Sequence, residues 1–199
     1  MKEIKIEIVL LSPMQLGSGQ ADVIIDSEAV HDEYGMPYFP AKRFKGLLYE
    51  SAIEMAELSN EKWFTKAEID RLFGNKDSLN AGFRVDNFTL ENYESMCGQW
   101  RMLQKNYPTL FNAKNVWETY TEIRYQTQID KETGTAAEGS LRNMRVVDAG
   151  LKFYGVIYLF DEQKVNQEII EKALLNLRYA GAKRNRGFGE VKCSIVSCK

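Results

Sequence analysis

The sequence predicts an α+β domain in which two helices cover one face of a four-stranded antiparallel sheet. Polar and apolar residues alternate near both ends of the chain, at 4–10 and 190–199, as in strands with one buried face. Apolar residues recur at helical spacing in two longer stretches, 40–58 and 165–177. The main elements therefore follow the order strand, helix, strand, insertion, strand, helix, strand.

The first half of the chain contains the first strand, the first long helix and several shorter pieces. Residues 16–37 are rich in Gly, Asp and Ser and are expected to form a long loop or a weak hairpin. Pro40 is expected at the first helical position, where a helix tolerates proline best. A second short helix is expected at 63–74 and a strand at 81–93, whereas residues 95–117 fit neither type of element clearly.

The second half of the chain completes the sheet and adds a projecting arm. Residues 119–130 and 144–160 have strand-like sequences, and the segment between them is small, polar and glycine-containing. A hairpin spanning about 126–146 is therefore expected to project from the body. The second long helix is expected to be capped by Gly181. The complete order is that of the βαββαβ unit of ferredoxin-like domains, with an inserted helical segment.

Composition favours one folded domain, residues 1–199. A chain of 199 residues with 44% hydrophobic content can bury one sizeable core. Lys and Arg number 26 against 28 Asp and Glu, a net charge of −2, so nothing attracts nucleic acid or an acidic membrane to the whole molecule. A site for a polyanion must therefore be local.

Cysteine and histidine usage argues against a zinc or disulfide framework. Cys97, Cys193 and Cys198 have no metal-ligand spacing, and His31 is the single histidine. The N-terminus alternates in polarity, and the longest apolar stretch, 153–160, is far too short to span a bilayer. We therefore expect a cytoplasmic protein with no membrane partner.

Two basic, glycine-containing turns indicate a local phosphate site. Lys42, Arg43 and Lys45 stand in the first turn of the first long helix, where the helix dipole disfavours cations, and Gly46 follows them. An anion bound at the helix N-terminus explains these charges, and a solvated polar face is the alternative. The second turn places basic residues among three glycines, a backbone arrangement that suits phosphate. Its basic residues are Lys183, Arg184 and Arg186.

These turns and the arm resemble segments of the RAMP superfamily of CRISPR-associated proteins, which carry RRM-like, ferredoxin-fold domains. GMPYFPAKRFKGLL resembles the family motif Pro-x-x-x-[Lys/Arg]-Lys-Gly, and AKRNRGFGEV resembles its C-terminal glycine-rich loop. TQIDKETGTAAEGSLRNMRVVDAGLKF is similar to the thumb hairpin of type III backbone subunits, and RLFGNKDSLNAGFRVDNFTL resembles the start of the strand between these motifs. Many relatives have Pro-Gly-Ser-Ser before Lys-Gly. Pro-Ala-Lys-Arg at 40–43 is most similar to the type III-D branch.

The resemblance implies a type III effector backbone subunit that binds CRISPR RNA and cleaves complementary target RNA at regular intervals. Its implied partners are these two RNAs, other subunits of the complex and neighbouring backbone subunits. The residues implied in guide RNA binding are Lys42, Arg43, Lys45, Gly46, Lys183, Arg184, Arg186 and Gly187. The thumb, which displaces a nucleotide, would include Thr127, Ile129, Arg142 and Met144.

The resemblance also places a catalytic carboxylate at Asp26. Family members that cut target RNA use an acidic residue in the loop before the first helix, and Asp26 is the matching position. One carboxylate that accepts a proton or holds Mg²⁺ or another divalent cation lowers the barrier once the 2′-OH faces the next phosphate. The alternative is a turn residue bonded to its own backbone. Asp22, Glu28 and Asp32 are neighbours that could exchange roles with it.

Other functions explain parts of the pattern. The same architecture could serve as a non-catalytic scaffold subunit. A RAMP endoribonuclease that processes CRISPR RNA would need His31 for catalysis and would leave the arm unexplained. An RRM-like RNA chaperone would lack its base-stacking motif on the central strand. Tyr49 and Phe188 could stack on bases, although core packing suits Phe188 better.

Overall fold

A computed structural model describes residues 1–19, 25–74, 81–160 and 163–198, so Asp22 lies outside the described residues. The strands are β1 (Lys2–Leu10), β2 (Phe83–Val85), β3 (Thr89–Leu90), β4 (Thr121–Gln126), β5 (Arg142–Val147), β6 (Lys152–Leu159) and β7 (Val191–Cys198). The helices are α1 (Ala41–Leu58), α2 (Lys66–Phe73), α3 (Tyr93–Asn106), α4 (Ala113–Glu118) and α5 (Lys164–Asn176), with a 3-10 turn, η1 (Arg184–Arg186).

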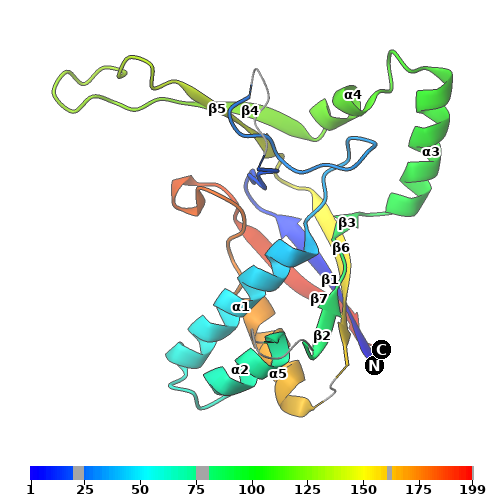
Figure 1. Ribbon diagram of the computed structural model, residues 1–199, viewed down its shortest axis with the longest axis vertical. Coiled ribbons are helices and arrows are strands. Elements are labelled where there is room, and N and C mark those ends of the chain that lie inside the picture. Colours follow the sequence, from blue (N-terminus) through cyan, green and yellow to red (C-terminus); the bar gives the residue numbers. More distant parts are fainter. Residues whose placement is uncertain (20–24, 75–80, 161–162, 199) are drawn as a thin grey trace.

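The main sheet confirms the predicted α+β class and the ferredoxin-like topology. Its antiparallel strands have the order β2-β6-β1-β7, with β3 also paired to β6. The unit β1-α1-β2 therefore interleaves with the unit β6-α5-β7, as a split βαβ arrangement requires. Helices α1, α2 and α5 lie on one side of this sheet (Figure 1).

The core lies between this sheet and its helices. The apolar residues that alternate along β1 are all at most 1% exposed: Ile4, Ile6, Ile8 and Leu10. Phe44 and Leu48 of α1 are fully buried, and Ile169 and Ile170 of α5 are equally inaccessible. Both helices thus turn the apolar stripe seen in the sequence toward β1.

Aromatic packing fixes the point where α1 begins. Phe39 and Phe88 exchange two backbone hydrogen bonds, at 2.8 and 2.9 Å. The Phe44 ring centroid lies 4.4 Å from that of Phe88. Pro40 has an extended ψ of 130° and stands just before the helix, so its predicted place at the first helical position is wrong by one residue. Ala41 opens the helix and donates its N–H to the Asn87 side chain at 2.9 Å.

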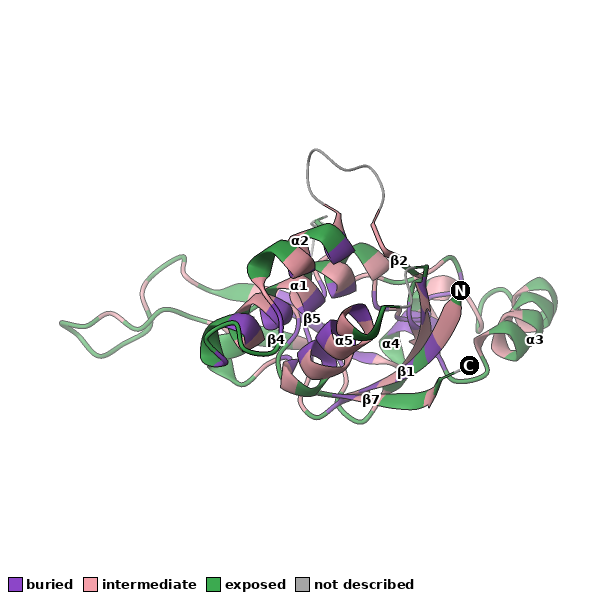
Figure 2. Ribbon diagram, turned by 90° about the horizontal axis from the view of Figure 1, so that it is seen from below, coloured by how far each residue is buried: buried purple, intermediate pink, exposed green. Residues whose placement is uncertain are grey.

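The same packing divides the strand predicted at 81–93 into β2 and β3. Phe88 turns into the core to pair with Phe39, which interrupts the pairing with β6. The undecided stretch 95–117 contains most of α3 and most of α4. Helix α3 has no buried residue and lies away from the helical layer (Figure 2).

Gly181 does not cap α5, contrary to the prediction. The helix ends at Asn176, and Gly181 adopts a φ of +81° further along the chain. A Cβ at this position would lie 2.6 Å from the Gln15 carbonyl oxygen. The glycine is therefore needed for the close approach of the C-terminal loop to the segment after β1.

The arm is a second, two-stranded sheet formed by β4 and β5. Residues 127–141 continue it away from the body as a long loop (Figure 1), and most of this loop is exposed. Asp130 closes the tip by accepting the N–H groups of Glu132 and Thr133 at 2.8 and 3.0 Å. Within the described part of the chain, no helix is long and apolar enough to cross a membrane.

Candidate nucleic-acid interface

The loop that carries Asp26 lies along the outer edge of β5, at the root of the arm. In an antiparallel pair, every second N–H of an edge strand points away from its partner. The outward N–H of Arg145 donates to the Ser27 carbonyl at 3.0 Å, and that of Asn143 donates to the Asp26 carboxylate at 2.9 Å. The loop is therefore anchored to the outer edge of β5 by backbone and side-chain hydrogen bonds.

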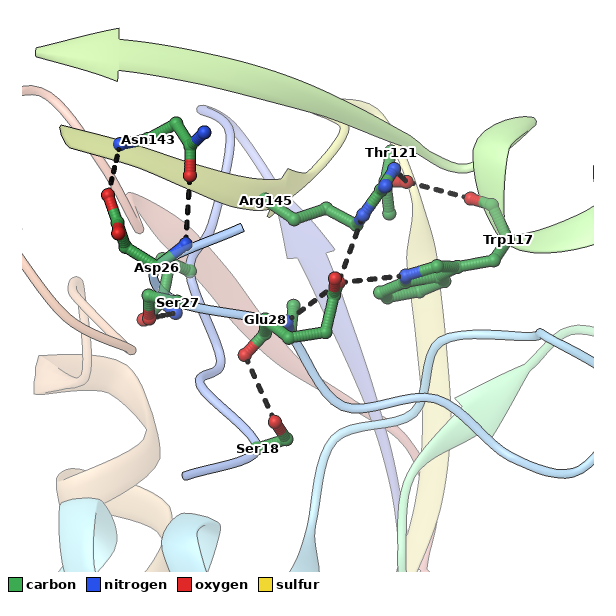
Figure 3. Close-up of polar contacts among 10 residues, drawn as sticks. Ser18, Asp26, Ser27, Glu28, Trp117, Thr121, Asn143 and Arg145 are labelled. Carbon is green, nitrogen blue, oxygen red and sulfur yellow. Dashed lines mark hydrogen bonds and ion pairs between the residues drawn. The ribbon is translucent and has the colours of Figure 1, made fainter. Parts of the chain in front are cut away.

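Asp26 is exposed and held by a reciprocal pair of hydrogen bonds (Figure 3). Its Oδ2 accepts the Asn143 N–H, and its own N–H donates to Asn143 Oδ1 at 2.8 Å. Both bonds reach a residue 117 positions away, so they are not the local bonds of an ordinary aspartate turn. Oδ1 of Asp26 has no hydrogen bond to any described residue and can accept a proton or a cation.

Asp32, one of the acidic neighbours, has a structural role. Its Oδ1 accepts the N–H groups of Tyr34 and Met36 at 2.9 and 2.8 Å. Its Oδ2 accepts the Tyr93 hydroxyl at 2.7 Å, and burial together with this bond raises the pKa of Tyr93. Asp32 thus fastens the chain ahead of α1 to α3. The remaining described neighbour, Glu28, binds Arg145 and is treated below.

His31 is held by packing contacts. Its ring centroid lies 4.8 Å from that of Trp117, and its Nδ1 is 2.7 Å from the Asp32 carbonyl oxygen. A catalytic histidine needs a nucleophile or a proton acceptor within hydrogen-bond reach. Among the described residues, His31 has no contact with Asp26, so the ring is better explained by its tilted packing against Trp117.

Three cations gather where the glycine-rich loop meets the root of the arm. Lys183 has a left-handed φ of 57° and donates its Nζ to Gln126 of β4 at 2.5 Å. Partial burial, with repulsion from Arg186 and Arg142, holds the pKa of Lys183 below its ordinary value. Among the described residues none of these three cations pairs with a carboxylate. Arg142 directly precedes Asn143 in β5, so one member of this cationic cluster is the chain neighbour of the residue that holds Asp26.

Arg184 differs from the three residues of the cationic cluster. Its guanidinium lies 3.6 Å from the Glu50 carboxylate of α1. An ion pair between two such exposed groups contributes little stability. It does direct Arg184 toward α1, away from the arm.

The basic residues at the start of α1 divide between two hollows on either side of the helix. Lys42 and Lys45 line a hollow of about 540 Å³ together with Tyr49. Partial burial lowers the pKa of Lys45, and its Nζ lies 5.2 Å from the centroid of the Phe83 ring. Tyr49 donates its hydroxyl to Asp70 at 2.7 Å across the same hollow.

Arg43 lines the second hollow, of about 490 Å³, and donates to the Gly17 carbonyl. Ser27 and Gly181 line this hollow as well, so it adjoins both the Asp26 loop and the glycine-rich loop. Gly46 lines both hollows, and a Cβ at Gly46 would meet no atom within 4 Å. The backbone at Gly46 is therefore exposed between the two hollows, with no side chain above it.

The predicted thumb residues occupy different environments. Ile129 is 56% exposed on the arm, and Thr127 braces it through a 2.7 Å hydrogen bond to Ser140. Met144 is 2% exposed at the root, so its side chain packs in the interior. Phe188 is half-buried.

Sequence reasoning missed two residues that shape this interface, Asn143 and Gln126. Each is a polar residue of the arm, and each acts on a group far away in the sequence. A sequence signal for Asn143 does exist. Asn143 and Arg145 are two residues apart in a strand, so their N–H groups point to the same edge of β5. No sequence signal marks Gln126.

The RAMP superfamily profile matches residues 7–192, which include the Asp26 loop, both basic turns and the arm. The chain belongs to the RAMP superfamily. Two relatives are both named CRISPR system Cms endoribonuclease Csm3. The protein of Methanocaldococcus jannaschii is 26% identical over 84% of this chain, which spans 66% of that relative's length. The protein of Mycobacterium tuberculosis is 27% identical over 99% of this chain and 88% of its own length.

Solved structures share the fold of this RAMP protein. A chain of type III-B Cmr-beta in the apo state superimposes with a TM-score of 0.71 at 16% identity, covering 98% of this chain and 97% of that one. A chain of Cmr-beta bound to cognate target RNA gives 0.69 at 16% identity, with 96% of both chains covered. At this identity the likeness establishes the fold.

Proposed function

We propose that this RAMP protein is a backbone subunit of a type III CRISPR effector complex, which binds guide CRISPR RNA and cleaves complementary target RNA. The observation that carries the proposal is that the exposed Asp26 carboxylate, held by Asn143, and the cationic cluster both lie at the root of a projecting arm. The names of both relatives, and the Cmr-beta folds, support the same assignment.

Guide RNA binding rests on the two basic turns. Lys42, Lys45 and Arg43 would contact successive phosphates on either side of α1, and the strand would cross this helix over Gly46. The glycine-rich loop would continue this track toward the arm through Lys183 and Arg186. We infer that the partners are CRISPR RNA, target RNA, other subunits of a type III complex and neighbouring copies of the subunit.

Cleavage rests on Asp26. In the described part of the chain, no group of three or more His, Cys, Asp or Glu side chains is arranged to hold a metal ion by itself. Mg²⁺ at nucleotide sites is often bound by one or two carboxylates together with substrate phosphates, and one exposed carboxylate fits this donor set. Asp26 would hold such a cation, which when bound supplies charge stabilisation at the phosphate. Asn143 orients the carboxylate, and the cationic cluster positions the RNA backbone.

The second candidate function is a scaffold subunit with the same RNA contacts and no cleavage. The exposure of Asp26 favours the catalytic form, because a scaffold needs no exposed carboxylate at the root of the arm, where the cationic cluster would bind the RNA backbone. We further propose that the protein works in the cytoplasm, where its three free thiols, Cys97, Cys193 and Cys198, would stay reduced.

Assembly with the partner subunits tests the function directly. CRISPR RNA is expected to co-purify with the complex, and complementary target RNA should be cut at regular intervals when Mg²⁺ is present and remain intact in EDTA. A target with a scrambled sequence is the control. Absence of co-purifying RNA would contradict the proposal, and bound but uncut target would establish the scaffold function instead.

Substitutions at Gly46 are expected to affect the stability of the fold and the affinity for RNA in opposite directions. Alanine at this exposed helix position is expected to raise the free energy of unfolding by about 0.5–1 kcal/mol, because glycine is the weaker helix former. Gly46→Gln, which also favours helix, is expected to fold as well but to weaken RNA binding by obstructing the crossing. Gly98→Gln in α3, where a Cβ also meets open space, is the matched control. Thermal unfolding and RNA titration measure the two effects, and unchanged RNA affinity in Gly46→Gln would contradict the crossing.

A further inference from the structure

A second set of contacts joins the Asp26 loop to the arm, deeper than the Asp26–Asn143 pair. Arg145 of β5 lies with its Nε 3.0 Å from the Glu28 carboxylate, and the two side chains are only 8% and 18% exposed. The same carboxylate oxygen accepts the indole N–H of Trp117 at 3.0 Å (Figure 3). Glu28 therefore connects the loop to two elements of the hairpin region.

Arg145 is itself fixed by the strand opposite. Its guanidinium donates to the Thr121 hydroxyl of β4 at 3.1 Å, and this hydroxyl donates to the Trp117 carbonyl at 2.8 Å. The network Glu28–Arg145–Thr121–Trp117 thus closes on itself. We call it the root network.

The root network has the same register as the bonds that hold Asp26. Glu28 follows Asp26 by two residues, and Arg145 follows Asn143 by two residues. The Arg145 N–H also donates to the Ser27 carbonyl between these two pairs, so the loop and β5 are joined at three neighbouring points and a shift at one pair would displace the other. A buried ion pair adds little net stability, but the loss of one partner is costly. The Glu28–Arg145 pair is therefore suited to holding the loop in one position on β5.

We propose that Glu28 and Arg145 are positioning residues, which keep the Asp26 carboxylate in register with the root of the thumb. The inference rests on the proposed cleavage function and adds to it. Under the proposed function, the arm would set which RNA nucleotide is displaced, and the root network would set where the carboxylate stands relative to that nucleotide. Cleavage then depends on the network although neither residue touches the reacting atoms. Displacing a reacting group by about 1 Å can cost a factor of about 100 in rate.

The test uses Glu28→Gln in the assembled complex, because glutamine keeps the size and the acceptor oxygen while removing the charge that faces Arg145. We expect single-turnover cleavage at saturating target RNA to fall about 10- to 100-fold, with the affinities for guide and target RNA unchanged. The Mg²⁺ concentration that supports half the maximal rate is expected to rise. Glu122→Gln is the matched control, since Glu122 forms an exposed ion pair with Arg124 on the same hairpin.

Amide hydrogen exchange provides a readout that does not depend on activity. Exchange in residues 25–29 is expected to speed up in Glu28→Gln and to stay unchanged in Glu122→Gln. Trp117→Phe keeps the aromatic ring and loses only the N–H donor, so it is expected to shift exchange and rate in the same direction by a smaller factor. This variant decides the matter if Glu28→Gln fails to fold.

The outcomes separate this inference from the proposed function. Wild-type cleavage and exchange in both variants, or a loss of cleavage that only parallels a loss of RNA affinity, would overturn the positioning role. Retained cleavage in an Asp26→Ala complex would instead remove the cleavage function on which the inference rests. An inactive Asp26→Ala complex beside a fully active Glu28→Gln complex would refute the positioning role alone.

Discussion

Asp26→Ala is expected to abolish target RNA cleavage while leaving guide RNA binding intact. One oxygen of the exposed carboxylate is held by the Asn143 N–H and the other has no hydrogen bond to a described residue, so its loss removes the group that would accept a proton or a cation. We expect the single-turnover rate to fall by a factor of about 100 or more. The measurement is cleavage of a complementary target by the assembled complex in Mg²⁺, at saturating target.

Asp26→Asn sharpens this prediction, because asparagine retains the shape and can still accept the Asn143 N–H. It should bind and fold like the wild type and remain nearly inactive, since the amide carries no charge. A matched control is Asp130→Asn at the tip of the arm, which alters a turn remote from the root. Activity retained in Asp26→Asn would show that the charge is not required, and a loss of RNA binding would show that the residue acts through the guide.

Removal of the cationic cluster is expected to have the second large effect, on RNA affinity. Lys183, Arg186 and Arg142 repel one another without a carboxylate partner in the described chain, and an RNA phosphate would relieve this repulsion. The double variant Lys183→Ala/Arg186→Ala is expected to weaken RNA binding on the order of 10-fold or more at all sequences. The slope of log affinity against log salt should decrease by about two.

The same double variant should not lose stability, because it removes like charges that face each other. Titration of RNA at several salt concentrations measures the effect, with Lys114→Ala on the exposed side of α4 as the control for net charge. An unchanged salt slope in the double variant, with wild-type affinity, would show that these cations do not contact phosphate. A lower melting temperature would indicate a structural role for Lys183 through Gln126.

Much of the fold was accessible from the sequence because its signals are local. Alternation along β1 and the apolar stripes of α1 and α5 record which side of each element is buried, and this periodicity does not depend on the partner. The order of these elements then allows few topologies, which is how the split βαβ sheet followed. Both basic turns were also recognisable from the sequence. The first has cations at a helix start, where the helix dipole disfavours them, and the second has cations among glycines.

Contacts between distant segments could not be predicted in this way. Phe88 interrupts the strand predicted at 81–93 because it forms backbone hydrogen bonds with Phe39. Gly181 lies beyond the end of α5, where the Gln15 carbonyl approaches its backbone closely. Pro40 was misplaced by one residue for a related reason, since packing around Phe44 decides where the first helical turn begins.

For the candidate site, the sequence by itself determined which groups could do chemistry, and the tertiary structure decided which of them stand together. The cations of the two basic turns were identified from residue type and position, and Asp26 through the resemblance to the RAMP superfamily. The roles of Asn143, Glu28 and Arg145 depend on the position of the loop along the edge of β5, 117 residues away in the chain. The chemistry of a side chain is set by its residue type, whereas two residues 117 positions apart come together only through the packing of the whole fold.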